Sequence, residues 1–215
     1  MFYTFLLWGF FFSVGCDENS DQTLVIPSGL SSVWIINEGN YGANNSSITL
    51  LDTLYDDTTF TQATGSYLEG NGVHSAVFTD SSAWLMMTGS NKISILHRRT
   101  LKSMHTISDI ESPRNGVLYQ NTMYITSYYD SLVIGYHATN YTEMHRYKLN
   151  HRPDEITAVN GFLVVSNSRS PDGEISKDTV ISQIDIASSE VNEYVIGVLP
   201  VSVCVNPNAN KVYIA

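Results

Sequence analysis

The chain has 215 residues with 21 acidic and 11 basic side chains, which gives a formal net charge of −10 at pH 7. Proteins that bind nucleic acid rely on lysine and arginine to neutralise phosphates, so this balance argues against a nucleic-acid partner. A chain of this length can bury a substantial core within a single domain.

The N-terminal segment predicts export. Residues 1–15 contain no Asp, Glu, Lys, Arg or His, whereas polar residues begin directly after Cys16. A short apolar run of this kind is typical of a secretory signal, because a membrane span needs about 20 apolar residues. The run Ser13-Val14-Gly15-Cys16 is similar to a lipobox. We therefore expect a signal peptide over 1–15, a lipid on Cys16 and a linker over 16–30; an ordinary signal peptide with an incidental cysteine is the alternative.

The remainder of the chain repeats with a period of about forty residues. Short runs rich in Val, Ile, Tyr and Trp alternate with Asn, Asp, Gly and Ser, which favours strands joined by turns. Pro113 and Pro153 lie forty residues apart, and the apolar run at 84–88 aligns with that at 124–127 at the same period. A repeat of this length with four strands is typical of a β-propeller blade.

The expected strands, in chain order, fill about four and a half blades over residues 31–215. Each full blade has four antiparallel strands, A to D. The predicted strands are 33–37 and 48–52; 73–78, 84–88, 92–97 and 103–107; 115–119, 123–127, 132–137 and 143–149; 155–159, 162–167, 180–186 and 193–198; and 201–205 and 212–215. The fold class is therefore an all-β propeller of four-stranded antiparallel blades. We expect a fragment of a larger ring, with a complete ring of four or five blades as the alternative.

Ligand contacts are expected where the B–C and D–A loops of a propeller converge on the axis, because a rigid scaffold holds such loops in place. Asn and Gly in these loops are equally explained as turn formers. Arg114 and Arg152 flank the repeated prolines, so we expect them at the same blade position, either binding a ligand or pairing with an acid of the next blade. The candidate binding residues are Asn37, Glu38, Asn40, Tyr41, His74, Arg114, Asn115, Tyr128, Tyr129, Asp130, Arg152 and Asp154.

Catalytic and metal-binding patterns are not found in the sequence. The histidines show no metal-ligand spacing, and there is no nucleophile elbow or phosphate-cradling glycine loop. His97 and His137 fall at equivalent ends of C strands, which favours a structural role in each repeat. Cys204 lies in an apolar run, so we expect a small core residue. We predict a binding protein with no catalytic residue, cofactor or metal.

The run Asn37-Glu38-Gly39-Asn40-Tyr41-Gly42, followed by a strand that ends at Asp52, resembles the opening of the YncE-like, YVTN-repeat surface lipoproteins of Bacteroidetes. This family includes BtuG-type cobalamin-binding propellers. The resemblance implies a seven-bladed, lipid-anchored propeller at the outer membrane and cell surface. It would capture a small molecule, such as a corrinoid, for a TonB-dependent outer-membrane receptor. The contacts we then expect are Tyr41, Arg114, Tyr128, Tyr129 and Arg152.

Two other functions remain as alternatives. One is an envelope protein-interaction scaffold that uses the same loops on another protein. The other, less favoured, is an enzyme similar to propeller lyases or quinoproteins. Propellers support many functions, so the fold does not choose among them.

Overall fold

A computed structural model describes residues 32–40, 42–52, 68, 70–98, 100–169, 179–197, 200–206, 208 and 211–215. The predicted signal peptide, the lipidation site Cys16 and the linker lie outside these residues. Within the part of the chain that the structure describes, no helix is long and apolar enough to cross a membrane.

Three four-stranded antiparallel sheets lie between two two-stranded sheets in the described part of the chain. The first sheet pairs β1 (Ser32–Asn37) with β2 (Ser47–Asp52). The three full sheets contain β3 (Val73–Phe78), β4 (Ser82–Met87), β5 (Lys92–His97) and β6 (Ser103–Ile107); β7 (Pro113–Tyr119), β8 (Thr122–Ser127), β9 (Leu132–His137) and β10 (Glu143–Lys148); and β11 (Arg152–Val159), β12 (Phe162–Arg169), β13 (Val180–Asp185) and β14 (Val191–Val195). The last sheet pairs β15 (Val203–Val205) with β16 (Val212–Ile214).

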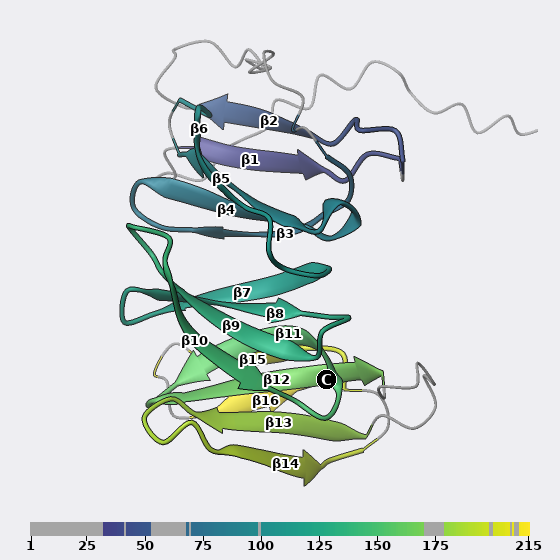
Figure 1. Ribbon diagram of the computed structural model, residues 1–215, viewed down its shortest axis with the longest axis vertical. Coiled ribbons are helices and arrows are strands. Elements are labelled where there is room, and N and C mark those ends of the chain that lie inside the picture. Colours follow the sequence, from purple (N-terminus) through teal and green to yellow (C-terminus); the bar gives the residue numbers. More distant parts are fainter. Residues whose placement is uncertain are drawn as a thin grey trace, which may run out of the picture.

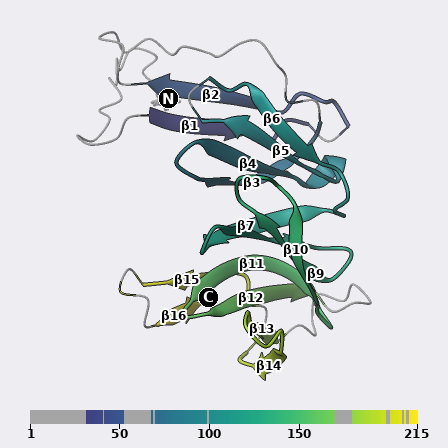
Figure 2. The same ribbon diagram turned by 60° about the vertical axis from the view of Figure 1, so that its left-hand side comes forward.

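The sheets follow one another along an arc, in the order of the sequence (Figure 1). The turned view keeps the same order from β1–β2 to β15–β16 (Figure 2). Inner strands of successive sheets, β3, β7, β11 and β15, are neighbours across the sheet boundaries. This arrangement of four-stranded antiparallel blades around an axis confirms the predicted fold class.

The core lies between the blades rather than within one of them. Blades 2 (β3–β6) and 3 (β7–β10) share a cluster of fully or almost fully buried side chains: Trp84, Met86, Ile93, Ile95, Ile107, Ile110, Met123, Ile125, Ile134 and Tyr136. A second cluster joins blade 3 to blade 4 (β11–β14), with Tyr124, Val133, Tyr147, Leu149, Ile156, Leu163, Val165 and Ile184. Each blade thus buries apolar faces that it could not bury alone.

The turn face, which is the end of the blades that carries the β3–β4, β7–β8 and β11–β12 turns, is built from repeated local structure. Gln120 and Asn121 have φ of 46° and 64°, and Asn160 and Gly161 have φ of 49° and 85°. Positive φ at both central residues is the requirement of a type I′ hairpin turn, which explains Asn and Gly there.

Cys204 differs from the prediction of a core residue. It lies in β15 opposite Tyr213 and is exposed. Successive side chains of a strand point to opposite faces, and the neighbouring Val203 occupies the buried face with 5% exposure. An apolar run therefore does not fix which of its residues points inward.

Candidate functional site

The loop face is the opposite end of the blades, where the inner strands begin and the β1–β2, β4–β5 and β8–β9 connections lie. The register of β3 with β4 shifts between Val73 and Ser75, and that of β7 with β8 between Pro113 and Gly116. In the third full blade the register of β11 with β12 shifts between Pro153 and Ile156. Each inner strand therefore begins with a β-bulge, which bends the strand and redirects a side chain.

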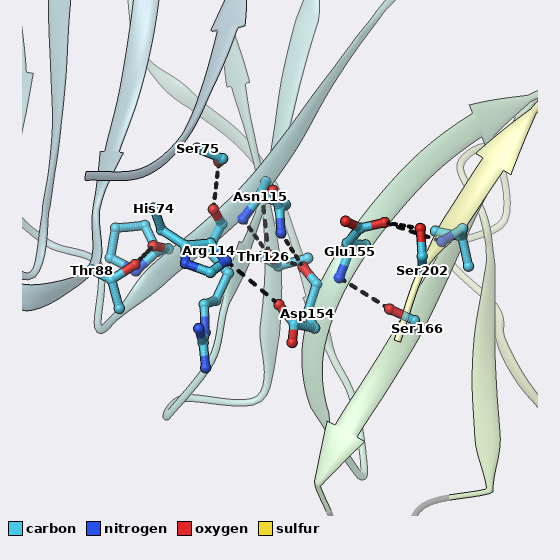
Figure 3. A network of polar contacts seen from close by, with 12 residues as sticks. His74, Ser75, Thr88, Arg114, Asn115, Thr126, Asp154, Glu155, Ser166 and Ser202 are labelled. Atoms are coloured by element: carbon cyan, nitrogen blue, oxygen red, sulfur yellow. Dashed lines mark hydrogen bonds and ion pairs between the residues drawn. The ribbon is translucent and has the colours of Figure 1, made fainter. Parts of the chain in front are cut away.

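Three different side chains occupy the equivalent bulge position of the three full blades. They are His74, Arg114 and Asp154, each forty residues from the next. His74 Nε2 lies 3.9 Å from Asp154 Oδ1, so the side chains of blades 2 and 4 meet in front of blade 3. Figure 3 shows this contact, with the Arg114 side chain beside it and its guanidinium pointing away. The repeat thus delivers a base, a cation and an acid to one place near the axis.

Hydrogen bonds between blades hold these bulges in position (Figure 3). Ser75 Oγ donates to the carbonyl oxygen of Arg114 at 2.5 Å. One blade further, Thr126 Oγ1 donates to the carbonyl oxygen of Asp154 at 2.8 Å, with Asn115 Nδ2 at 3.5 Å from the same oxygen. Because these contacts bind backbone carbonyls, they leave the side chains of Arg114 and Asp154 available for other interactions.

The acid Glu155 has a different role from Asp154, its neighbour in sequence. Its Oε2 accepts hydrogen bonds from Ser202 Oγ at 2.7 Å and from the Val203 backbone N–H at 3.2 Å. Glu155 therefore joins β11 to β15 and is a structural residue.

Burial lowers the pKa of His74, and the positive charge of Arg114 lowers it further. The carboxylates of Asp154, Glu38 and Glu155 act in the opposite direction, but with smaller effect. The ring nitrogen near Asp154 therefore belongs to a neutral imidazole at pH 7, and the contact is a polar contact rather than a full ion pair.

A cluster of two arginines and two tyrosines adjoins the bulges. The Arg114 guanidinium carbon lies 4.5 Å from the centre of the Tyr128 ring, and that of Arg152 lies 5.6 Å from the same ring. Arg152 is also 5.4 Å from the ring of Tyr129, which meets Tyr128 edge-on at 5.2 Å. Tyr128 is 4% exposed, whereas Tyr129 is 63% exposed. Tyr128 is thus a buried platform for the arginines, and Tyr129 presents its ring to solvent.

The guanidinium of Arg114 makes no hydrogen bond or ion pair with any described residue. Its Nε is a buried nitrogen without a hydrogen-bond partner. The guanidinium therefore lies over the Tyr128 ring with its Nε–H unpartnered among the described residues. A buried donor without a partner is costly and calls for an explanation.

Other predicted site residues lie in the β1–β2 loop. Asn37 Nδ2 donates to Ser47 Oγ at 3.1 Å, and the Asn40 backbone N–H donates to Asn45 Oδ1 at 2.7 Å. Glu38 is exposed, and its carbonyl oxygen accepts from the Gly72 N–H at 3.3 Å, which ties the loop to blade 2. Tyr41 lies outside the described residues.

Asp130 lies away from the bulges. Its Oδ2 accepts from Ser127 Oγ at 3.1 Å, and its carbonyl oxygen accepts from Lys148 Nζ. Its neighbours line a hollow of about 430 Å³ between blades 2 and 3, together with Glu111 and Arg146. The structure therefore brings together His74, Arg114, Asp154, Arg152 and the two tyrosines, while Asp130 belongs to a separate hollow.

The expectation that Arg114 and Arg152 share a blade position is wrong. Pro113 pairs with Ser127 and Pro153 pairs with Asn167, so the prolines are equivalent as predicted. Arg114 follows its proline and Arg152 precedes the other, which places them two residues out of register. They meet at Tyr128 because the side chains come from neighbouring blades. The forty-residue period instead makes Arg114 equivalent to His74 and Asp154, and this spacing could have been used to predict their shared position.

No family model and no curated protein matches the chain. Solved structures do match. Streptogramin B lyase is similar with a TM-score of 0.61 and 15% identity, over 86% of this chain and 58% of that one. The hydrazine synthase of Kuenenia stuttgartiensis has a TM-score of 0.54 and 15% identity over 62% and 38% of the two chains. The WD40 repeats of RRP9 have a TM-score of 0.58 and 10% identity over 76% and 47%.

These neighbours establish the β-propeller fold. The chain spans between 38% and 58% of the length of the structures it matches. They include both enzymes and a repeat domain, so the likeness concerns the scaffold and not the chemistry at its axis.

Proposed function

We propose that this protein is a YncE-like cell-surface lipoprotein that captures a small molecule for a TonB-dependent outer-membrane transporter. A corrinoid such as cobalamin is the leading ligand, as the β1–β2 loop motif implies. In this proposal the protein binds and delivers its ligand without chemical change. Cys16 carries the lipid anchor at the outer membrane.

The observation that carries this proposal is the Arg114 guanidinium, which no described residue satisfies. Beside it, the Tyr129 ring is 63% exposed at the same face. Exposed aromatic rings and fixed hydrogen-bond donors are the groups that orient a small molecule on a rigid scaffold. The cross-blade hydrogen bonds of Ser75 and Thr126 keep the bulges in place before a ligand arrives, which reduces the entropy cost of binding.

Calorimetric titration of cyanocobalamin into the protein tests this proposal. We expect one-to-one, saturable binding that weakens several-fold to about tenfold in Tyr129→Ala, the loss expected for an aromatic contact. Tyr194→Ala is the matched control, because Tyr194 is 47% exposed on the outer strand β14, away from the loop-face bulges.

A folded protein that gives no heat with cyanocobalamin would remove cobalamin as the ligand. Equal weakening by Tyr129→Ala and Tyr194→Ala would remove the loop face as the binding site. In the first case, crosslinking to envelope proteins would test the scaffold alternative.

A further inference from the structure

We propose that the Arg114–Tyr128–Tyr129 cluster is an oxyanion subsite, which binds a carboxylate or phosphate group attached to a flat ring. This inference rests on the proposed binding function and specifies the chemistry of the ligand. The oxyanion would bind the terminal nitrogens of Arg114, and the ring would contact Tyr129.

The first step of the argument is the donor geometry of Arg114. A guanidinium presents a planar fork of N–H groups that matches a carboxylate or phosphate in a bidentate fashion. Here the plane is fixed from one side by Tyr128, with the Arg114 Cζ 4.5 Å from the ring centre. Tyr128 is 4% exposed and cannot move away. The fork is therefore oriented before any ligand binds.

The second step is that, among the residues the structure describes, none hydrogen-bonds to this fork. Asp154 occupies the equivalent position of the next blade, yet its carboxylate contacts His74 Nε2 at 3.9 Å and not Arg114. The carboxylate of Glu155 is occupied by Ser202 and Val203. In the described part of the chain this partly buried arginine has no carboxylate partner, and an incoming anion would supply one.

The third step concerns the positive charges beside the Tyr128 ring. Arg152 adds a second cation, 5.6 Å from the Tyr128 ring and 5.4 Å from the Tyr129 ring. His74 is neutral at pH 7 and adds no charge, while Asp154 is the closest opposing carboxylate. Two arginines flank Tyr128, whereas the carboxylates that act on His74 are those of Asp154, Glu38 and Glu155. The positive charge is therefore confined to the arginines over the Tyr128 ring, and the proposed oxyanion would bind there.

The exposed ring of Tyr129 specifies the second half of the ligand. It meets Tyr128 at an interplanar angle of 78° and lies under Arg152. A flat ring joined to the oxyanion could pack against Tyr129 while its acidic group reaches Arg114. Aryl carboxylates, aryl phosphates and nucleotide-like groups share this chemistry.

Benzoate is the probe for this subsite, and the side-chain Nε–H resonance of Arg114 is the readout. The buried Nε should give an observable signal because its proton exchanges slowly with water, and its loss in Arg114→Gln assigns it. We expect a saturable shift with benzoate, a weaker one with acetate and none with benzyl alcohol or chloride. Inorganic phosphate against acetate then shows which oxyanion the fork prefers.

Affinity for benzoate should fall about tenfold or more in Arg114→Gln, since a charge-assisted hydrogen bond is lost. It should fall to the level of acetate in Tyr129→Ala. Arg146→Gln is the matched control, because Arg146 is bound by Glu143 through contacts of 2.9 and 2.7 Å on the outer strand β10.

Benzoate affinity retained in Arg114→Gln, or an Arg114 signal that responds equally to chloride, would overturn the oxyanion subsite. These outcomes are separable from the proposed capture of cobalamin. Cyanocobalamin bound equally by wild type and Arg114→Gln would leave capture standing and contradict the subsite. Benzoate binding without cyanocobalamin binding would do the reverse.

Discussion

The two ends of the blades use the same repeat in opposite ways. On the turn face, equivalent positions close the same kind of turn: His97 and His137 end the third strands of blades 2 and 3, and Asp185 ends that of blade 4. His97 Nδ1 accepts from the Thr100 N–H at 3.2 Å, and His137 Nδ1 accepts from the Thr139 N–H at 3.3 Å. Each histidine closes the turn that follows it, which confirms the structural role predicted for this pair.

On the loop face, the equivalent positions hold three different residues, His74, Arg114 and Asp154. Their backbones are held by the same kind of cross-blade hydrogen bond, but their side chains do not repeat an interaction. A position that serves the fold makes the same kind of contact in each full blade, because each has the same turn to close. In blade 4, Asp185 Oδ1 accepts from the Ala187 N–H at 2.8 Å, as the two histidine rings do in their own turns. In the proposed function these three positions of the loop face, His74, Arg114 and Asp154, face a ligand, and an asymmetric ligand would present different groups to each blade.

Substitutions in the interblade core should lower the free energy of unfolding most. Trp84 is fully buried between blades 2 and 3, and its Nε1 donates to Ser82 Oγ at 3.2 Å. We expect Trp84→Ala to lower the free energy of unfolding by about 3–5 kcal/mol, because it opens a cavity in the interblade core. Chemical denaturation followed by circular dichroism measures this loss.

Val195→Ala is the control for that measurement. Val195 is 78% exposed on β14, so its truncation should change the free energy of unfolding by no more than about 0.5 kcal/mol. Comparable losses in the two variants would contradict an interblade core as the main source of stability.

A substitution on the turn face should lower the free energy of unfolding less than one in the interblade core does. His137 Nδ1 also contacts Thr139 Oγ1 at 3.0 Å, and its Nε2 lies 3.2 Å from Asn121 Nδ2. We expect His137→Ala to lower the free energy of unfolding by about 1–2 kcal/mol through the loss of these hydrogen bonds. His74→Ala should cost less than half as much, since among the described residues the polar contact of the His74 side chain is the long one with Asp154. An equal loss in the two variants would show that His74 is a structural residue too.

The sequence predicted the blades well because their signal is local. Strands β3, β5, β6 and β9 have the predicted bounds, since alternating apolar runs ended by turn residues fix a strand from its own residues. Strands β7 and β11 begin at Pro113 and Arg152, earlier than predicted, because the β-bulges interrupt the pattern of alternation.

The site was harder to predict because it depends on contacts between blades. The structure brings His74, Arg114 and Asp154 together at the loop face, and their role in binding a ligand stays a prediction. Neighbouring residues in the sequence do not predict that Tyr128 is buried or that Asp130 lines a separate hollow. Both depend on how β8 and β9 pack against the neighbouring blades, which no single segment encodes.

The smallest effect we expect is on the pH dependence of stability, through the titration of His74 at the loop face. Its folded pKa lies below 6.5, first because of burial and second because of the charge on Arg114. The unfolded chain therefore binds the proton at higher pH than the folded chain does. The stability that neutral His74 contributes is fully present above 6.5 and is lost as the pH falls from there toward the folded pKa. Replacing His74 by Gln should remove this part of the pH dependence.

Nuclear magnetic resonance titration of the His74 ring can separate the contributions of its two neighbours. Arg114→Gln should raise the pKa of His74, because it removes a positive charge that disfavours the imidazolium. Asp154→Asn should lower the pKa further, because it removes the closest stabilising carboxylate. Opposite shifts from the two variants would demonstrate that residues of three successive blades act on one point at the axis. If both substitutions shifted the pKa of His74 in the same direction, they would act by altering the burial of its ring. The different side chains of the three blades would then not act on His74 through their charges.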